Sequence, residues 1–567
     1  MNTLNDDSTN NTNQHQPQSW DQIYTFPRLL HPYSLEPFVL QPSLFHDNNV
    51  PPTIYFNTKL NEESKPPLEL PKKLQQMFKW KISSITPNTI RSCISFMRFE
   101  VVRPSNQDDT SYLGSWCKHM PTADFSGLEE WRKVNHYPGS FHMGRKDKLW
   151  SRLKLAGDKF DSFHPRTFIL PKDYEELDKY WKECPDKLFI MKPPASARGN
   201  GIRVINKISQ VPSSAFQPSI DGSIKKSTIV VQEYISKPCL LENGLKFDLR
   251  IYVLLTSVDP LRVYVYDEGL VRFASSKYTS QQDGIIDQFM HLTNYFVNKN
   301  NQGHQTDYDC ESLHSCKWSL KRFWRYLNEH HKHVDTKRLW EEIIDIIIKT
   351  CISCEGPMYR LSHQFCKNDY TSYELFGFDI ILDEDFKPWI LEVNITPSLK
   401  SESSLDTSVK YRVIKDMFNL VGYHLPPPNQ TMRLKLGHLA DQKSFFDSRL
   451  YQESLSKRDR IKHLKYQKLF KQRIEESTSR RASISDESLL SDLSQSDARV
   501  LMLAEDELSR CGQFARVFPS ANSSKYMKYF DKPRYYNLLL DAWEQKYKDN
   551  RLEGVRRLSN LAKFLEP

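Results

Sequence analysis

The sequence predicts an α+β fold for the central part of the chain, residues 89–426. Two observations predict it. Short runs of β-branched and aromatic residues recur between turn-forming residues, which is typical of strands. Two longer segments between these runs carry apolar residues at helical spacing, which indicates helices with one buried face.

The expected elements follow from these patterns. Helices are expected at 317–328 and 336–351, and in the second Leu339, Ile343, Ile346 and Ile347 mark the buried face. Strands are expected at 188–191, 201–205, 228–234, 247–256, 261–266, 375–382 and 389–393.

The segments on either side of this core differ in composition. Residues 1–88 are rich in Pro, Asn and Ser without a sustained apolar period, which predicts a largely disordered N-terminal extension. Residues 427–479 follow a proline run and form a basic, helix-compatible segment. A Ser-rich linker at 480–497 leads to residues 498–567, whose aromatic and apolar density predicts a helical segment that packs on the core.

Composition excludes several classes of protein. The chain has 567 residues and a modest net charge of +9. Its polar start lacks a secretion signal, and its apolar runs are too short to span a membrane, so no membrane association is expected. Ten cysteines are scattered along the chain, and Cys351 and Cys354 have no second pair to complete a zinc site, which fits reduced thiols in the cytosol.

A basic loop between two expected strands is the first candidate site. In KPPASARGNGI, Lys192 can reach phosphate oxygens, while Arg198, Gly199 and Gly201 form a flexible loop whose backbone can close over them. The glycine spacing matches neither a Walker loop nor a Rossmann fingerprint. Taken alone, the segment is equally compatible with an ordinary hairpin turn.

Two further strands carry polar residues that suit a nucleotide. The backbone of VVQEYI can form hydrogen bonds with a purine, and Glu233 can accept a hydrogen bond from a ribose or an amino group. Taken alone, the same sequence is also compatible with an ordinary buried strand. In KFDLR, Lys246, Asp248 and Arg250 alternate with apolar residues and so share one strand face. That face either lines a site or is solvated.

The strongest local signal is acidic. Two apolar strands joined by an acidic turn carry Asp379, Glu392 and Asn394 where burial of a lone charge would be costly. Adjacent antiparallel strands can bring these side chains together, and two carboxylates with an amide oxygen suit Mg²⁺ that also bridges nucleotide phosphates. The alternative is that Asp379 and Glu392 form structural ion pairs with Lys or Arg side chains.

Seven sequence words carry a family resemblance. In chain order they are NHYPGSFHMGRKDKLW, KPPASARGNGI, KFDLRIYV, EGLVRFAS, MHLTNYFVNK, FGFDIILD and LEVNITPSL. They resemble the tubulin tyrosine ligase-like family, and most of all its four-type branch, the polyglutamylases. The resemblance covers about residues 116–426 and implies an ATP-grasp core.

The resemblance implies a role for each matching residue, with Lys192, Arg198 and Arg272 as catalytic residues. It implies Mg²⁺ at Asp379, Glu392 and Asn394, and the substrate at Arg272, Tyr295 and Lys410. Phe296 and Ile395 depart from the residues frequent in the family, which leaves the amino-acid pocket open. The implied ATP contacts are Lys192, Arg198, Gly199, Gln232, Glu233, Tyr234, Ile235, Lys246, Phe247, Asp248, Thr293 and Asn294.

The implied activity is a ligase reaction. ATP would phosphorylate a glutamate side chain of a tubulin tail, and free L-glutamate would attack the acyl phosphate to form an isopeptide bond. A monomer acting in the cytoplasm and on the cytoskeleton, with the cilium or basal body as a narrower location, fits this substrate. The alternatives are a glycine or tyrosine ligase of the same fold and an inactive microtubule-binding scaffold.

The basic segment is the candidate docking element. Between residues 457 and 473 eight Lys or Arg stand against Asp459 alone, which suits acidic tubulin tails, or is simply a solvated helix face. A helix here would place Arg458, Lys462, Lys465 and Arg473 along one side. No nucleic-acid-binding pattern accompanies it. The word RRAS at 480–483 is a candidate phosphorylation site.

Overall fold

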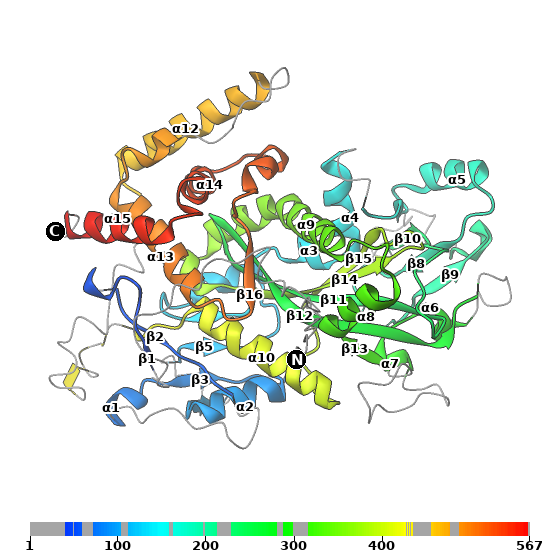
Figure 1. The fold of residues 1–567 in the computed structure, drawn as a ribbon, viewed down its shortest axis with the longest axis horizontal. Helices are drawn as coiled ribbons and strands as arrows, with labels where there is room; N and C mark the ends of the chain where they lie inside the picture. The colour runs from blue at the N-terminus through cyan, green and yellow to red at the C-terminus, as the bar shows by residue number, and fades with distance from the viewer. Residues whose placement is uncertain are drawn as a thin grey trace, which may run out of the picture.

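The structure, a computed structural model, is built around two antiparallel sheets (Figure 1). It describes residues 40–48, 50–58, 72–103, 112–157, 163–196, 199–212, 228–279, 287–298, 316–426, 428, 430, 433–434, 455–476 and 487–564. Within these ranges, no helix combines the length and the hydropathy that a membrane crossing requires.

The larger sheet has the strand order β13-β12-β11-β14-β15, and β16 pairs with β12. Its two long central strands are buried almost throughout, which explains their apolar composition. The bounds of its strands are β11 Leu245–Val258, β12 Leu261–Lys277, β13 Lys317–Ser319, β14 Glu374–Leu382, β15 Pro388–Ile395 and β16 Phe514–Phe518.

Two helices cover opposite faces of this sheet. α9 (Thr336–Phe365) packs with Leu249 and Ile251 of β11, while α10 (Ser404–Val421) packs with Tyr252 and Leu254, which point the other way. The predicted helix at 336–351 is confirmed and continues to residue 365. The predicted segment 317–328 begins as strand β13 and becomes α8 (Leu320–His330).

The smaller sheet has the order β7-β10-β8-β9 and lies at one end of the molecule (Figure 1). Its strands are β7 Thr167–Leu170, β8 Phe189–Lys192, β9 Arg203–Ile205 and β10 Ile229–Glu233. α5 (Tyr174–Glu183) covers it, and the Trp181 ring stacks on Phe189 with centroids 4.1 Å apart.

The expected N-terminal boundary at residue 88 is too far along the chain. Within 1–88, residues 40–48, 50–58 and 72–88 are part of the fold, whereas 1–39 and 59–71 lie outside the described residues. Phe56 and Trp80 are fully buried against Phe418 of α10, with ring centroids 4.9 and 5.1 Å away. Isolated aromatic residues fill the core here without a sequence period, so the pattern did not reveal them.

The remaining elements before the C-terminal part are short. A parallel sheet has the order β4-β3-β5-β6, and β1 pairs with β2. The strands are β1 Leu40–Gln41, β2 Thr53–Ile54, β3 Lys79–Lys81, β4 Glu100–Val102, β5 Gly114–Ser115 and β6 Lys133–Val134. The α-helices are α1 Lys72–Gln75, α2 Asn88–Phe96, α3 Phe141–Gly144, α4 Lys146–Leu155, α6 Gln288–His291 and α7 Tyr295–Asn298. Segments of 3-10 helix lie at His46–Asn48, Thr122–Gly127, Ile208–Gln210 and Asp369–Thr371.

The C-terminal part packs on the core, and not through helices alone. β16 extends the large sheet beside β12 (Figure 1), a strand the sequence pattern did not predict. The basic helix is α12 (Lys457–Glu476), and it is followed by α13 (Gln495–Ser509), α14 (Tyr535–Tyr547) and α15 (Arg551–Phe564). Part of the expected linker is folded, because a 3-10 turn lies at Glu487–Leu490 and α13 begins within the linker. A further 3-10 helix lies at Ser523–Tyr529.

Candidate active site

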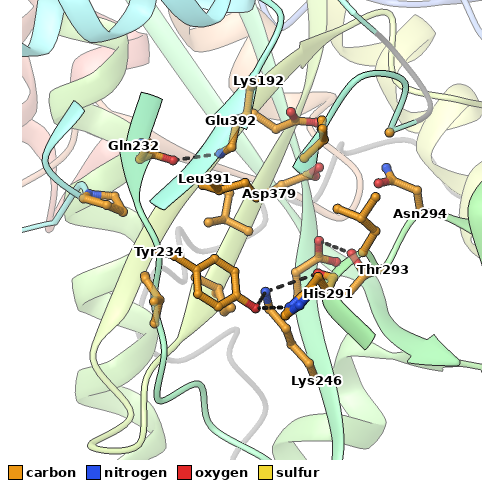
Figure 2. A pocket seen from close by; sticks show the side chains of 18 of the residues that line it. Lys192, Gln232, Tyr234, Lys246, His291, Thr293, Asn294, Asp379, Leu391 and Glu392 are labelled. Atoms are coloured by element: carbon orange, nitrogen blue, oxygen red, sulfur yellow. Dashed lines mark hydrogen bonds between the residues drawn. The ribbon is translucent and has the colours of Figure 1, made fainter. Parts of the chain in front are cut away.

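A cavity between the two sheets gathers nearly all the residues singled out from the sequence (Figure 2). Arg198 lies outside the described residues, as does the side chain of Tyr295, which begins α7. Lys410 is described but does not line the cavity. The predicted residues that do line it are Lys192, Gly199, Gln232, Glu233, Tyr234, Ile235, Lys246, Phe247, Asp248, Arg272, Thr293, Asn294, Asp379, Glu392 and Asn394.

Strand register places a row of charges on one face of the large sheet. Asp248 pairs with Arg272 across β11 and β12, and Asp379 pairs with Glu392 across β14 and β15. Directly opposed residues share a face, so these side chains point the same way. Lys246, Asp248 and Arg250 are each less than a tenth exposed, so a solvated face is excluded for them. Further along β11 the same face becomes apolar and meets α10.

Lys192 enters the cavity from the smaller sheet. Its Nζ donates to Gln232 Oε1 at 2.7 Å, and Gln232 Nε2 donates to Thr167 at 2.8 Å, which fixes the amide (Figure 2). Burial lowers the pKa of Lys192 to about 8, although the negative charge of Glu392 opposes that shift. A buried ammonium with a nearby amide is suited to hold a phosphate oxygen.

Lys246 forms a second buried cation at the opposite end of the cavity in Figure 2. Its Nζ donates to Tyr234 Oη at 2.9 Å and to the His291 carbonyl at 3.2 Å. Tyr234 Oη also lies 2.7 Å from His291 Nδ1. Burial lowers the pKa of Lys246 to about 7, Asp248 opposes this shift, and Lys192 adds to it. Among the described residues, no carboxylate lies within ion-pair distance of Lys246. The positive charge of Lys246 is therefore available to an incoming anion.

Arg272 is the residue predicted to bind the incoming amino acid, and its guanidinium already contacts two aspartates. Nε and Nη2 donate to the two oxygens of Asp248 at 2.7 and 2.6 Å, and Nη2 lies 2.8 Å from Asp379. Thr293 donates to the same Asp248 at 2.7 Å. Nε and Nη2 of the guanidinium are therefore occupied, which leaves Nη1 as the nitrogen that contacts neither aspartate.

Asp379 and Asn394 are two of the three residues of the predicted metal site. Arg250 Nε donates to Asp379 at 2.7 Å, and Asn394 Nδ2 donates to it at 3.1 Å. Burial disfavours the charged carboxylate, but Arg250 and Arg272 together hold the pKa of Asp379 well below its usual range. The Asp379 carboxylate is therefore ionised. The nitrogen of the Asn394 amide, and not its oxygen, donates to this carboxylate.

Glu392 completes the set, and Lys146 holds it. Lys146 Nζ lies 2.9 Å from Glu392 Oε2, and Glu392 is about a fifth exposed toward the cavity. Two carboxylates and an amide oxygen at a polar cavity wall are the hard oxygen donors that Mg²⁺ prefers. The donor set thus fits a divalent cation, and the structural ion pairs that the sequence left as the alternative are present as well.

Three predicted contacts differ from expectation. Glu233 turns toward the outer wall, where its carboxylate lies 2.5 Å from Lys187 Nζ and accepts from Tyr180 at 2.9 Å. The Phe247 ring packs in the core on the α9 face, 5.4 Å from Phe323, so only its backbone faces the site. Lys410 pairs with Asp406 at 2.7 Å.

Sequence reasoning missed two titratable residues of the cavity, Lys146 and His291. Both stand in words that carried the resemblance, NHYPGSFHMGRKDKLW and MHLTNYFVNK, but neither has a local pattern that marks its role. Gly199, in contrast, has a clear requirement. Gly199 has a φ of +77°, and a Cβ there would lie 2.9 Å from the Val297 side chain of α7. The backbone at residue 199 therefore lies this close to α7 because the residue is glycine.

The chain is similar to known proteins of one family. Residues 126–433 match the model of the tubulin-tyrosine ligase family. The chain is 41% identical over 537 residues to human tubulin monoglutamylase TTLL4, covering 93% of this chain and 42% of that protein. It is 38% identical over 527 residues to tubulin polyglutamylase ttll-4 of Caenorhabditis elegans, covering 92% of this chain and 80% of that protein.

A mouse protein named tubulin polyglutamylase TTLL5 is 34% identical over 469 residues, which is 81% of this chain and 33% of that protein. The chain therefore spans less than half the length of the mammalian relatives and most of the nematode one. The ATP-grasp type of fold expected from the sequence is confirmed by the family match. The chain belongs to the tubulin-tyrosine ligase family.

Proposed function

We propose that this chain is an ATP-dependent ligase that joins free L-glutamate to glutamate side chains of tubulin tails. The observation that carries the proposal is the convergence of Lys192, Asp379, Glu392 and Asn394 on one cavity between two sheets. The relatives' names, tubulin monoglutamylase and polyglutamylase, support glutamate as the amino acid and tubulin as the acceptor.

ATP would lie along the cavity with its phosphates toward Lys192. The base would lie against the strand backbone at Gln232–Ile235, where the cavity adjoins a larger one of about 990 Å³ that shares Pro165 and Tyr234. Lys246 would supply a second positive charge, and Gly199 would let the loop after β8 close over the phosphates. Arg198, in the same loop, is proposed to contact them.

Asp379, Glu392 and Asn394 would hold Mg²⁺. The ion supplies Lewis-acid stabilisation of charge that builds up on transferring phosphoryl oxygens. Lys146 keeps Glu392 oriented, and Arg250 and Arg272 keep Asp379 ionised at neutral pH.

The chemistry follows from the acceptor being a carboxylate, which is a poor acyl donor. Its oxygen attacks the γ-phosphorus, and ADP leaves. The amine of free glutamate then attacks the acyl phosphate carbon, loses a proton and displaces phosphate. Lys192 and Lys246 stabilise the negative charge of the first step, and no covalent enzyme intermediate is required.

Arg272 is proposed to bind a carboxylate of the incoming glutamate through Nη1, because its other edge binds Asp248. Tyr295 and Lys410 are proposed to assist at the substrate, although Lys410 would first have to exchange part of its contact with Asp406. Fixing the guanidinium before substrate arrives reduces the entropy lost on binding.

The exposed face of α12 is proposed to dock on tubulin. Lys457, Arg460, Lys465, Lys468 and Lys471 are exposed along it, whereas Lys462 turns inward and lies 2.7 Å from Asp497. Lys462 therefore does not lie on the exposed side of the helix, where its spacing from Arg458, Lys465 and Arg473 had placed it. RRAS at 480–483 lies outside the described residues. Binding to tubulin would localise the protein to the cytoskeleton, including cilia or basal bodies.

Transfer assays with labelled amino acids test the proposal. The protein is incubated with ATP, Mg²⁺, microtubules and labelled glutamate, glycine or tyrosine in parallel, and the product is mapped by mass spectrometry. Glutamate on glutamate side chains of the tails is expected. Glycine or tyrosine incorporation would replace the glutamate assignment, and no incorporation by folded protein that still binds microtubules would favour a scaffold.

A further inference from the structure

We propose that a second cavity, at the far end of β11 from the candidate active site, binds a multivalent phosphate-bearing anion. The cavity has a volume of about 340 Å³ and lies where the end of α9, the turn at Asp369–Thr371 and helices α12, α13 and α14 meet. Thr256 lines it, ten residues along β11 from Lys246, roughly 30 Å away at the rise of a strand. The cavity is thus separate from the ATP site.

The lining carries more positive than negative charge. Six Lys or Arg side chains line the cavity against three carboxylates. Three of the arginines are balanced: Arg262 lies 3.0 Å from Glu507, Arg534 lies 3.2 Å from Asp259, and Arg510 pairs with Asp506. The surplus of positive charge favours an anionic ligand with more than one charge.

Lys133 provides the clearest unbalanced charge. It is 5% exposed, its Nζ donates to the Tyr370 carbonyl at 2.7 Å, and it lies 3.7 Å from the centre of the Tyr370 ring. Among the described residues no carboxylate lies within ion-pair distance of it. Burial lowers its pKa to about 7, Glu507 opposes this shift, and Arg262 and Arg510 add to it. A bound anion would stabilise the ammonium form.

Apart from Arg534 Nε and Asp259 Oδ1, which form an ion pair with each other, three buried polar groups of residues that line the same cavity have no hydrogen bond to any described residue. They are Ser362 Oγ, Asn368 Nδ2 and His463 Nε2. The Asn368 amide is oriented because its Oδ1 accepts from the Tyr370 N–H at 3.0 Å. Buried groups of this kind are normally satisfied by a partner. All three can donate, so the missing partner is rich in acceptor oxygens.

A phosphate-bearing anion meets these requirements together. Phosphate groups offer several acceptor oxygens and multiple charges, and the volume falls in the range of small-molecule sites. The donors come from separate parts of the chain, Ser362 from α9 and His463 from α12. An occupant would therefore connect the basic helix to the core.

Calorimetric titration of the full chain tests this site. Inositol hexakisphosphate and inorganic pyrophosphate are each titrated into protein whose active-site cavity is filled with a non-hydrolysable ATP analogue. One-to-one binding is expected with at least one of the probes. Lys133→Met should weaken it roughly tenfold or more, since a charged hydrogen bond is lost.

Ser362→Ala is the second variant, because its hydroxyl makes no hydrogen bond to a described residue and its removal should not disturb the fold. It should weaken binding several-fold. Lys179→Met, on the exposed face of α5, is the matched control and should bind like the unaltered chain. Absence of binding by both probes at millimolar concentration would overturn the proposal, as would unchanged affinity in Ser362→Ala.

Discussion

Arg272 and Asp248 face each other on neighbouring strands, and both Nε and Nη2 of the arginine donate to the aspartate, at 2.7 and 2.6 Å. Nη2 also reaches Asp379, so one guanidinium joins the proposed ATP-binding aspartate to the proposed metal-binding one. The proposed amino-acid, nucleotide and metal parts of the site are thus joined through one side chain.

Replacement of Arg272 by Lys tests this link. Lysine keeps a positive charge but cannot bind Asp248 with two parallel hydrogen bonds. We expect the KM for glutamate to rise roughly tenfold or more, since one charged hydrogen bond to the substrate is lost. Steady-state kinetics with varied glutamate and varied ATP check it. An equal rise in both KM values with a lower melting temperature would instead indicate a purely structural role.

Glu392→Gln tests the metal site. The amide has almost the same shape but removes one of two carboxylate ligands, so transfer of labelled glutamate should fall by roughly 100-fold or more. Microtubule co-sedimentation of the variant should remain near that of the unaltered chain, because α12 is untouched. Normal turnover in Glu392→Gln would remove the metal hypothesis.

The two buried lysines predict a pH dependence of ATP binding. The pKa of Lys246 is lowered to about 7 and that of Lys192 to about 8, so each loses its proton as the pH rises through that value. A triphosphate binds the charged forms, so affinity should fall roughly tenfold or more between pH 7 and pH 9. Titration calorimetry across this range measures it. A flat profile would contradict the assignment, and Lys246→Met should flatten part of the dependence.

Arg534 predicts a large effect on stability. It lies 2.7 Å from Glu355 and 3.2 Å from Asp259, all in a buried setting that joins the C-terminal part to α9 and the β11–β12 turn. Arg534→Met leaves Glu355 unpaired and should cost about 3–5 kcal/mol in the free energy of unfolding. Denaturant titration measures this cost. Arg338→Met breaks the exposed pair with Glu342 and should cost no more than about 0.5 kcal/mol. Equal costs would contradict the account.

The docking face of α12 predicts a salt-dependent loss of microtubule binding. Lys465→Glu with Lys468→Glu should weaken co-sedimentation several-fold at low salt and much less at high salt, because exposed charges are screened. The matched control reverses Lys179 and Lys182 on α5, which are equally exposed and far from α12 (Figure 1). If both double variants bind alike, the docking role is rejected.

Much of the site could be predicted because its residues lie in regular strands. Asp379 and Glu392 stand on two strands joined by one short turn, so antiparallel pairing brings them together, and the register confirms that they are opposed. The alternation of Lys246 and Asp248 with apolar residues likewise fixed their shared face. Local geometry alone decided these positions.

Other features depend on contacts between distant parts of the chain. The sequence pattern predicts that β12 ends near residue 266, but the strand continues to Lys277. Gly269 allows this close pairing with β11, because a Cβ at residue 269 would lie 2.5 Å from the Arg250 carbonyl oxygen. Lys146 reaches Glu392 from α4, 246 positions earlier in the sequence. The edge strand β16 pairs with β12 across a similar separation. No local period encodes such pairings.

The most direct test is a crystal structure with a non-hydrolysable ATP analogue and Mg²⁺. The account predicts a cation held by Asp379, Glu392 and the Asn394 amide oxygen, with phosphate oxygens beside Lys192. A nucleotide bound elsewhere, or those three side chains turned apart with no cation between them, would contradict it.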